Sequence, residues 1–293
     1  MENTKIRVSF VIIHVKSVMS SLVKALGWNK SSYTLLSLFM LTIFLLGYVW
    51  WPLAEEYLAY IPWEGEWWRY MDWLLINIFL FMSFMIMARA DIRQDAKIVF
   101  VGLVGGLVIE SWGTQTEIWT YYTNERPPLW IIPAWPIASL SIDRIVRIQR
   151  WMTEDRGRLT AAVGGRWSSF WPRLYWLTFL AYFALFIPYV APTFDKSFTI
   201  IATALVAFFI LTPTDYRIAA LTFIAGSALG YYLELWGTTR EAWTYYTLAK
   251  PPLFAVLSHG MAAVAFWRAV RWLEAILGVR WLRGAGQPGI IRR

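Results

Sequence analysis

In this chain of 293 residues, 58% are hydrophobic and only 16% are charged, which is more apolar side chain than a soluble core of that size can bury. The net charge is +8, but Lys and Arg gather in alternate loops, a pattern typical of cytoplasmic membrane edges and not of a nucleic-acid-binding surface. With no cysteine and only His14 and His259 as imidazoles, disulfides, thiolate metal sites and histidine-rich metal or haem centres are excluded, and no cofactor is expected.

The chain begins with a basic segment that does not have the form of a cleaved signal peptide. Residues 5–26 alternate basic and apolar positions at helical spacing, so residues 1–30 are expected to form an amphipathic segment on the cytoplasmic face of the membrane. A frayed tail is the alternative. Eight apolar segments follow, and the third, fourth and sixth are short for lipid-facing spans. They are 33–53, 71–88, 97–112, 129–147, 170–191, 197–213, 217–236 and 252–273.

The distribution of charge predicts the orientation of these segments. Basic residues precede the first segment and gather in the second and fourth connections and the C-terminal tail, and the sixth connection carries Arg217, whereas the first connection is acidic. Cytoplasmic loops are enriched in Lys and Arg, so both termini are expected in the cytoplasm. The chain is therefore predicted to be an all-α polytopic protein of the cell inner (plasma) membrane, with eight transmembrane helices.

One 21-residue segment occurs twice. Glu110 to Trp130 matches Glu234 to Phe254 at 13 of 21 positions, with a constant offset of 124 residues and no gap. Such self-similarity indicates an internal repeat. The expected organisation is repeat 1 at 31–148, a basic cytoplasmic linker at 149–169, repeat 2 at 170–276 and a basic tail at 277–293.

Four spans in each repeat imply that both copies run in the same direction through the membrane. The two repeats are then parallel, with an axis along the membrane normal, as in some transporters. Both matched segments are expected on the same, non-cytoplasmic side.

The matched segments combine one carboxyl group with many aromatic rings. Glu110 and Glu234 follow long apolar runs, and a carboxyl group removed from water tends to keep its proton, as a general acid must. Aromatic faces attract a cation by about 0.5–2 kcal/mol each. We therefore expect Glu110 and Glu234 to be catalytic. The rings expected to bind substrate are Trp112, Trp119, Tyr121, Tyr122, Trp130, Trp135, Trp236, Trp243, Tyr245 and Tyr246.

Glycine and proline are expected to shape these segments. Gly113 and Gly237 are predicted to allow a tight turn out of the preceding helix. The pairs 127–128 and 251–252 are Pro-Pro and lead into the next helix. Pro133 and Pro136 are expected to kink the fourth span.

His259 is the one histidine near a matched segment, and its counterpart at offset 124 is Trp135. It is a candidate to relay a proton with Glu234, or else it hydrogen-bonds a neighbour. A purely structural interpretation of the segments also stands, because Trp and Tyr anchor helices at membrane interfaces. In that interpretation the two glutamates are solvated helix ends, or pair with Arg126, Arg240 or Lys250.

The stretches 110–135 and 234–259 resemble the membrane carotenoid-modifying proteins, namely the heterodimeric or fused lycopene cyclases and the related carotenoid hydratases. The shared features are an acidic residue at a helix end, a Gly…Trp-x-Tyr segment and a proline-led next helix. The Pro-x-Glu-Glu element of the cyclases is replaced here by a Pro-Pro pair before an apolar helix. The resemblance implies a membrane enzyme that cyclises or hydrates a long isoprenoid or carotenoid-like substrate.

Two other functions remain open from the sequence. One is a structural or assembly subunit of a larger membrane complex, and the other is a small-molecule or lipid transporter. The expected partners are membrane lipid or an isoprenoid substrate and no nucleic acid, with further membrane subunits or self-association left open.

Overall fold

The computed structural model describes residues 23–24, 26–160 and 169–276, which are mostly helical. The chain divides into two compact units, residues 1–96 and 97–293. Of the expected amphipathic segment (1–30), residues 1–22 and 25 lie outside the described residues. Linker residues 161–168 and the tail 277–293 also lie outside them.

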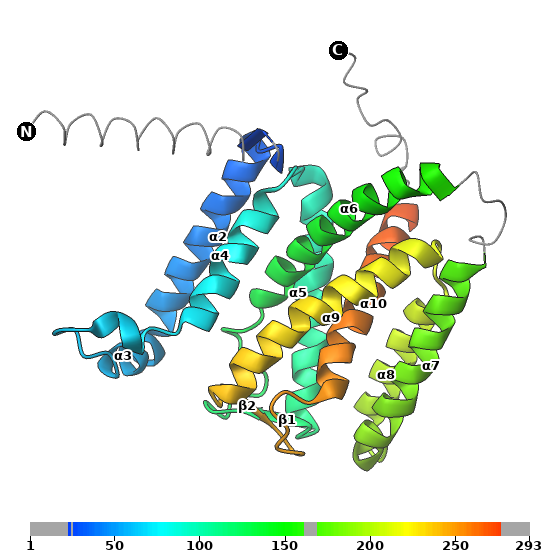
Figure 1. The fold of residues 1–293 in the computed structure, drawn as a ribbon. Helices are drawn as coiled ribbons and strands as arrows, with labels where there is room; N and C mark the ends of the chain where they lie inside the picture. The colour runs from blue at the N-terminus through cyan, green and yellow to red at the C-terminus, as the bar shows by residue number, and fades with distance from the viewer. Residues whose placement is uncertain (1–22, 25, 161–168, 277–293) are drawn as a thin grey trace, which may run out of the picture. The chain divides into compact units, whose positions relative to one another are not determined.

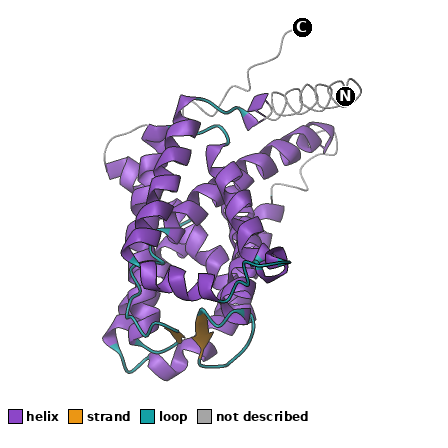
Figure 2. Ribbon diagram, turned by 90° about the vertical axis from the view of Figure 1, so that its left-hand side faces the viewer, coloured by secondary structure: helices purple, strands orange, loops and turns teal. Residues whose placement is uncertain are grey.

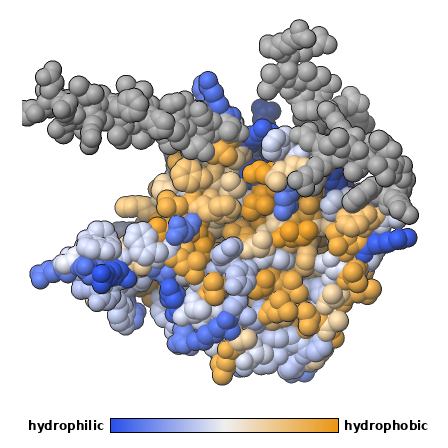
Figure 3. Space-filling view, in the orientation of Figure 1, coloured by the Kyte–Doolittle hydropathy of each residue, from blue (hydrophilic) through white to orange (hydrophobic). Residues whose placement is uncertain are grey.

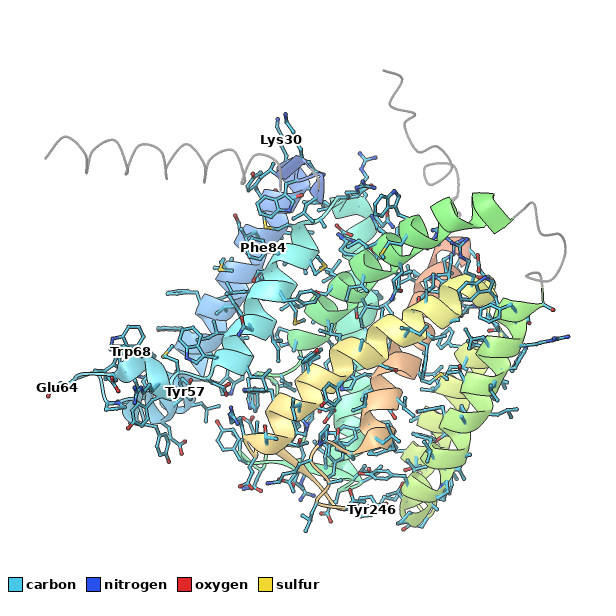
Figure 4. All side chains as sticks on the ribbon, viewed as in Figure 1. Lys30, Tyr57, Glu64, Trp68, Phe84 and Tyr246 are labelled. Atoms are coloured by element: carbon cyan, nitrogen blue, oxygen red, sulfur yellow. The ribbon has the colours of Figure 1, made fainter. Side chains whose placement is uncertain are left out.

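The first unit is a helical hairpin with a short helical insertion at its turn. Its elements are α2 (Lys30–Val49), α3 (Trp51–Ala59), the 3-10 helix η1 (Trp67–Tyr70), α4 (Trp73–Met87) and the start of α5 (Ile92–Gln115). The Asn29 side chain caps α2 by accepting from the backbone N–H of Ser32. Ser32 Oγ donates to the carbonyl of Met87 at 2.5 Å, which ties the start of α2 to the end of α4. Tyr57 and Trp68 project from the insertion (Figure 4).

The second unit contains the remaining helices and two short strands (Figure 1). In chain order they are α5, β1 (Trp119–Tyr121), α6 (Ala134–Thr160), α7 (Phe170–Val190), η3 (Ala191–Thr193), α8 (Ser197–Leu211), α9 (Tyr216–Thr239), β2 (Trp243–Tyr245) and α10 (Leu253–Ile276). The two strands pair with each other at one end of these helices (Figure 2). Residues of both matched segments belong to this unit and contribute to one hydrophobic core.

Five helices of the described chain are long and apolar enough to cross a membrane. They are α2, α5, the helix over Phe170–Thr193, α9 and α10, whereas α4 and α8 are apolar but shorter. Many large apolar side chains on these helices are exposed, such as Phe44, Leu180 and Ile201. Hydrophobic residues accordingly cover much of the helical surface in Figure 3. Lipid is the solvent in which such a surface is stable, so the chain is a helical membrane protein.

The start of α6 corrects one expectation. The apolar segment 129–147 was predicted to be helical throughout and kinked by Pro133 and Pro136. Instead α6 begins at Ala134, so Pro133 precedes the helix and Pro136 lies in its first turn. Proline is tolerated in a first turn because its missing N–H has no helical partner there, and no kink is required. The second copy differs, since α10 begins at Leu253, directly after its Pro-Pro pair.

Small residues bring neighbouring helices of the second unit close together. A Cβ at Gly102 of α5 would lie 2.8 Å from the Cα of Pro136 of α6. A Cβ at Gly226 of α9 would lie 2.9 Å from the Cα of Gly260 of α10. These are matched positions in the two copies, and both contacts need glycine for close packing between membrane helices. This close approach holds α5 against α6 and α9 against α10, the helices that carry Glu110, Trp135, Glu234 and His259.

Candidate functional site

The two matched segments adopt the same backbone conformation. Each leaves its helix through a residue with positive φ, forms a three-residue strand, passes a second residue with positive φ and reaches a cis proline. The positive-φ residues are Glu117 (61°) and Asn124 (58°) in one segment and Glu241 (57°) and Leu248 (59°) in the other. The cis bonds precede Pro127 and Pro251.

The strands of the two segments pair with each other. β1 and β2 are antiparallel, with Thr120 opposite Thr244 at the centre and a Trp opposite a Tyr on either side. The register is symmetric, because the offset of 124 converts each outer pair into the other. On both sides of the centre the Trp and Tyr rings lie 5.8 Å apart. The strand pair therefore covers the ends of α5 and α9 with four aromatic rings.

Gly113 and Gly237 do not form the turns that were expected of them. Both lie inside the last turn of their helices, α5 and α9. A Cβ at Gly113 would lie 1.9 Å from the ring of Trp119, and a Cβ at Gly237 would lie 2.0 Å from that of Trp243. Glycine is needed there because an indole ring lies directly on the helix backbone. The turn itself is made by the positive-φ residues Glu117 and Glu241.

These rings are held by the two carboxyl groups. Glu110 is buried, with 4% of its surface exposed, and accepts three hydrogen bonds. Trp119 Nε1 (3.1 Å) and Tyr121 Oη (2.9 Å) donate to its Oε2, and Trp135 Nε1 donates to its Oε1 at 3.0 Å. A buried carboxyl group is thus fully paired with side chains from β1 and α6.

Glu234 has the equivalent arrangement with one different partner. It is 3% exposed, and Trp243 Nε1 donates to its Oε2 at 2.9 Å. Tyr245 Oη donates to its Oε1 at 2.8 Å, and His259 Nε2 lies 2.9 Å from the same oxygen. His259 occupies the position that Trp135 holds in the first copy. The two rings stack on each other, with centroids 5.6 Å apart and planes 19° apart.

The two tyrosine hydroxyls lie outside the membrane-spanning helices and have strongly altered acidity. Burial raises the pKa of Tyr121 well above its usual range, and the adjacent Glu110 raises it further. Burial and then Glu234 raise the pKa of Tyr245 in the same way. Both hydroxyls therefore stay protonated at neutral pH and act as hydrogen-bond donors to the carboxyl groups.

The carboxyl groups and His259 line a cavity of about 180 Å³ in the second unit. Its walls are mainly apolar and come from α5, α6, α7, α8, α9 and α10 and the two strands. Six of the ten rings expected to bind substrate line it: Trp112, Trp119, Tyr121, Trp135, Trp243 and Tyr245. The structure therefore brings the three expected catalytic residues and most of the expected rings together.

The other four expected rings do not line the cavity. Tyr122 and Tyr246 are about half exposed, and Tyr246 lies beside the strand pair and donates to the carbonyl of Tyr189 (Figure 4). Trp130 packs edge-on against Tyr121, and Trp236 packs against Trp243. These two support rings that do reach the cavity.

Sequence reasoning missed the wall that α7 and α8 supply. Tyr182 and Phe186 of α7 face the cavity, together with Thr203 and Val206 of α8. Tyr182 Oη lies 3.2 Å from Oγ of Ser258 on α10. The signal available was the four-residue spacing of the two α7 rings, which places them on one helix face. Neither belongs to a matched segment, so the repeat did not point to them.

Arg126 and Lys250 pair with exposed glutamates of their own loops and not with the buried carboxyl groups. Arg126 lies 2.8 Å from Glu117, and Lys250 lies 2.6 Å from Glu241, at matched positions of the two copies. The hydrogen bond from Lys250 lowers the pKa of Glu241. Both pairs are exposed, and such pairs contribute little to stability. The charges of Arg126 and Lys250 are thus engaged outside the cavity.

Comparison with known protein families, with curated proteins and with solved structures finds no match. Among the residues that the structure describes, no group of three or more His, Asp or Glu side chains could hold a metal ion.

Proposed function

We propose that this chain is an integral membrane enzyme that cyclises or hydrates the end of a long isoprenoid or carotenoid-like substrate by acid-base chemistry through a carbocation. The observation that carries the proposal is the apolar cavity onto which Glu110, Glu234 and His259 all open. Groups able to give and take protons are rarely buried among aromatic rings without a functional reason.

We further infer that the chain consists of two parallel four-helix repeats, spanning the plasma membrane eight times with both termini in the cytoplasm. The matched conformations of the two segments and the alternation of basic and acidic connections support this arrangement. The short helices α4 and α8 and the polar α6 would cross with protein on part of their surface. The site then lies toward the non-cytoplasmic side.

The size and lining of the cavity suit one end of an apolar chain. An apolar cavity of about 150 Å³ accommodates a benzene ring, so about 180 Å³ admits a ring-sized end group and not a whole carotenoid. Aromatic faces around that group would stabilise a positive charge on carbon. Exclusion of bulk water would protect the cation from uncontrolled capture.

The proposed chemistry balances with the residues present. A carboxyl group gives its proton to one alkene carbon, the alkene π pair forms the new C–H bond, and a cation and a carboxylate result. In cyclisation a second alkene attacks the cation, and a carbon-bound proton passes to a carboxylate. In hydration water attacks instead and loses a proton to the carboxylate. The product has the mass of the substrate in the first case and gains one water in the second.

A structural role for both glutamates is the competing interpretation. In its favour, each carboxyl group already holds a Trp and a Tyr of its strand and a ring of the next helix. Two carboxyl groups bonded in this way would stabilise the strand pair even if neither took part in a reaction. The two interpretations differ in the catalytic activity they predict when a glutamate is replaced by the isosteric glutamine.

The test uses membranes that contain the full-length protein, with lycopene added as the probe. Products are separated by chromatography and their masses are determined by mass spectrometry. We expect conversion to an isomer or to a hydrate. Glu110→Gln and Glu234→Gln should each lower it by at least about 100-fold, the usual contribution of an acid or base. In deuterated water each cyclised end should gain one deuterium.

Glu117→Gln and Glu241→Gln are the matched controls, because they alter exposed glutamates of the same two segments. Both should convert lycopene as the unaltered protein does. Full activity in Glu110→Gln and Glu234→Gln would refute the catalytic assignment. Absence of conversion by the unaltered protein, with lycopene and other acyclic isoprenoids, would refute the proposed function.

A further inference from the structure

The two carboxyl groups of the cavity differ in one partner, and the difference has chemical consequences. Glu110 is bonded by Trp135, and Glu234 is bonded at the matched position by His259. An indole N–H only donates, whereas an imidazole nitrogen donates or accepts according to its protonation. The symmetric architecture therefore carries an asymmetric pair of acids.

The surroundings of Glu110 suit an ionised carboxylate. Each of its oxygens accepts from an indole N–H, which cannot receive a proton in return. The third partner, Tyr121 Oη, also donates. Hydrogen bonds from these three donors favour the charged form of Glu110 against the effect of its burial, and among the three partners only the Tyr121 hydroxyl could accept an O–H.

The surroundings of Glu234 contain such an acceptor. His259 Nε2 lies 2.9 Å from Oε1, and a neutral imidazole with its hydrogen on Nδ1 accepts an O–H bond there. A neutral carboxyl group and a neutral imidazole also avoid placing two full charges in an apolar cavity. One proton is then shared along a single short contact.

His259 is also the more exposed member of this pair. Its side chain is 21% exposed, whereas that of Glu234 is 4% exposed. The stacked face of Trp135 would stabilise the imidazolium that forms while a proton passes. The titratable side chains that line the cavity are Glu110 of α5, Tyr121 of β1, Tyr182 of α7, Glu234 of α9, Tyr245 of β2 and His259 of α10. Among these, His259 is the one imidazole, whose ring nitrogens can both take up and release a proton.

We propose that Glu234 and His259 share the mobile proton of this site, carried by the carboxyl group when the cavity is empty, while Glu110 is held as a carboxylate. Within the proposed function, on which its chemical meaning rests, Glu234 is the acid that protonates substrate and His259 restores its proton. Glu110 is the anion that stabilises the cation and accepts the proton lost on cyclisation.

Infrared spectroscopy of the purified full-length protein tests this assignment without any substrate. A protonated carboxyl group has a carbonyl-stretch band that a carboxylate lacks. At neutral pH we expect such a band when the spectrum of Glu234→Gln is subtracted from that of the unaltered protein, and none when the spectrum of Glu110→Gln is subtracted, because other carboxyl groups cancel. No band in the first difference, or a band in the second, would overturn the proposal.

Exchange of the differing partner provides a second, independent test. His259→Trp gives Glu234 the surroundings of Glu110 and should remove the band. Trp135→His gives Glu110 an acceptor and should increase the band about two-fold, because two carboxyl groups would then be protonated. An unchanged band in both variants would overturn the proposal.

The double exchange Trp135→His/His259→Trp keeps the same two rings in contact and guards against misfolding of the single variants. We expect it to retain one band, now removed by Glu110→Gln and not by Glu234→Gln. A band still removed by Glu234→Gln in this background would overturn the role of His259. If the bands behave as expected but lycopene is not converted, the proposed function fails while the proton assignment stands.

Discussion

At the scale of single residues, Gly113 and Gly237 decide how the aromatic rings lie. The indoles of Trp119 and Trp243 pack onto these glycines and are fixed by hydrogen bonds to Glu110 and Glu234. A ring held at its nitrogen cannot move away from a new methyl group without losing that bond. The glycine, the indole and the carboxyl group of each copy therefore act as one unit.

Gly113→Ala and Gly237→Ala should each destabilise the protein. The added Cβ would lie 1.9 or 2.0 Å from ring atoms, and overpacking of this kind costs about 1–3 kcal/mol. Thermal unfolding in detergent micelles should show a lower midpoint for both. Gly47→Ala in α2 is the control, since nothing lies within 4 Å of its new Cβ. It should be neutral or stabilising by up to ~1 kcal/mol, because alanine favours helix. If Gly113→Ala unfolded with the same midpoint as the unaltered protein, this packing would be contradicted.

At the scale of elements, the pairing of β1 with β2 joins parts of the chain that are 124 residues apart. A two-stranded pair this short is marginal in isolation. Here the helices under it stabilise the strand pair, because its Trp and Tyr side chains are buried and hydrogen-bonded to Glu110 of α5 and Glu234 of α9. The strand pair and the carboxyl groups thus depend on each other.

A disulfide between Thr120→Cys and Thr244→Cys tests this pairing in a chain that has no native cysteine. The two residues are directly opposite, and Cα atoms of hydrogen-bonded antiparallel pairs lie about 5.5 Å apart, within the range of disulfides. We expect oxidation to link the two positions. Cyanogen bromide cleaves after Met152, which lies between them, so the peptides 88–152 and 153–261 should stay joined until reduction.

Thr120→Cys with Thr247→Cys is the control for this crosslink. Residue 247 lies three positions further along the chain, in the turn that follows β2, and is no longer opposite residue 120, so a disulfide is not expected there. This pair should give separate peptides before and after reduction. Equal crosslinking of both pairs would show that the register differs from the one described.

At the scale of the whole molecule, the proposed parallel repeat places both matched loops on one side of the membrane. Antiparallel repeats would place them on opposite sides, where their strands could not pair. The basic connections at the other ends of the helices face the cytoplasm in this arrangement. Orientation is therefore open to a direct chemical test.

Glu117→Cys and Glu241→Cys, both at exposed loop positions, should react with a membrane-impermeant maleimide in intact cells. Arg93→Cys, exposed at the start of α5, should react only after the membrane is permeabilised. Labelling is measured by the mass added to the purified protein. Reaction of only one loop cysteine from outside, or of Arg93→Cys in intact cells, would contradict the proposed topology.

Much of the helical architecture follows from the sequence by itself. Each of the eight apolar segments contains a helix, because an apolar run in lipid must satisfy its own backbone hydrogen bonds. The sequence identity between the matched segments pointed to Glu110, Glu234 and the tryptophans near them, because the match can be read directly from the amino-acid sequence. Hydropathy also indicated a membrane protein, which the long apolar helices support.

Only the tertiary structure decided which groups meet. Nothing in the spacing indicated that Trp135 would stack on His259, or that Tyr182 of α7 would face the same cavity. Gly113 was expected at a turn because local sequence cannot reveal a ring lying on a helix. Hydropathy and turn signals are local, whereas the stacking of Trp135 on His259 depends on how helices from the two halves of the chain pack. The duplicated glutamates and the exchange of Trp135 for His259 could be seen in the sequence, but only the fold shows that each ring bonds the glutamate of its own copy and stacks on the other ring.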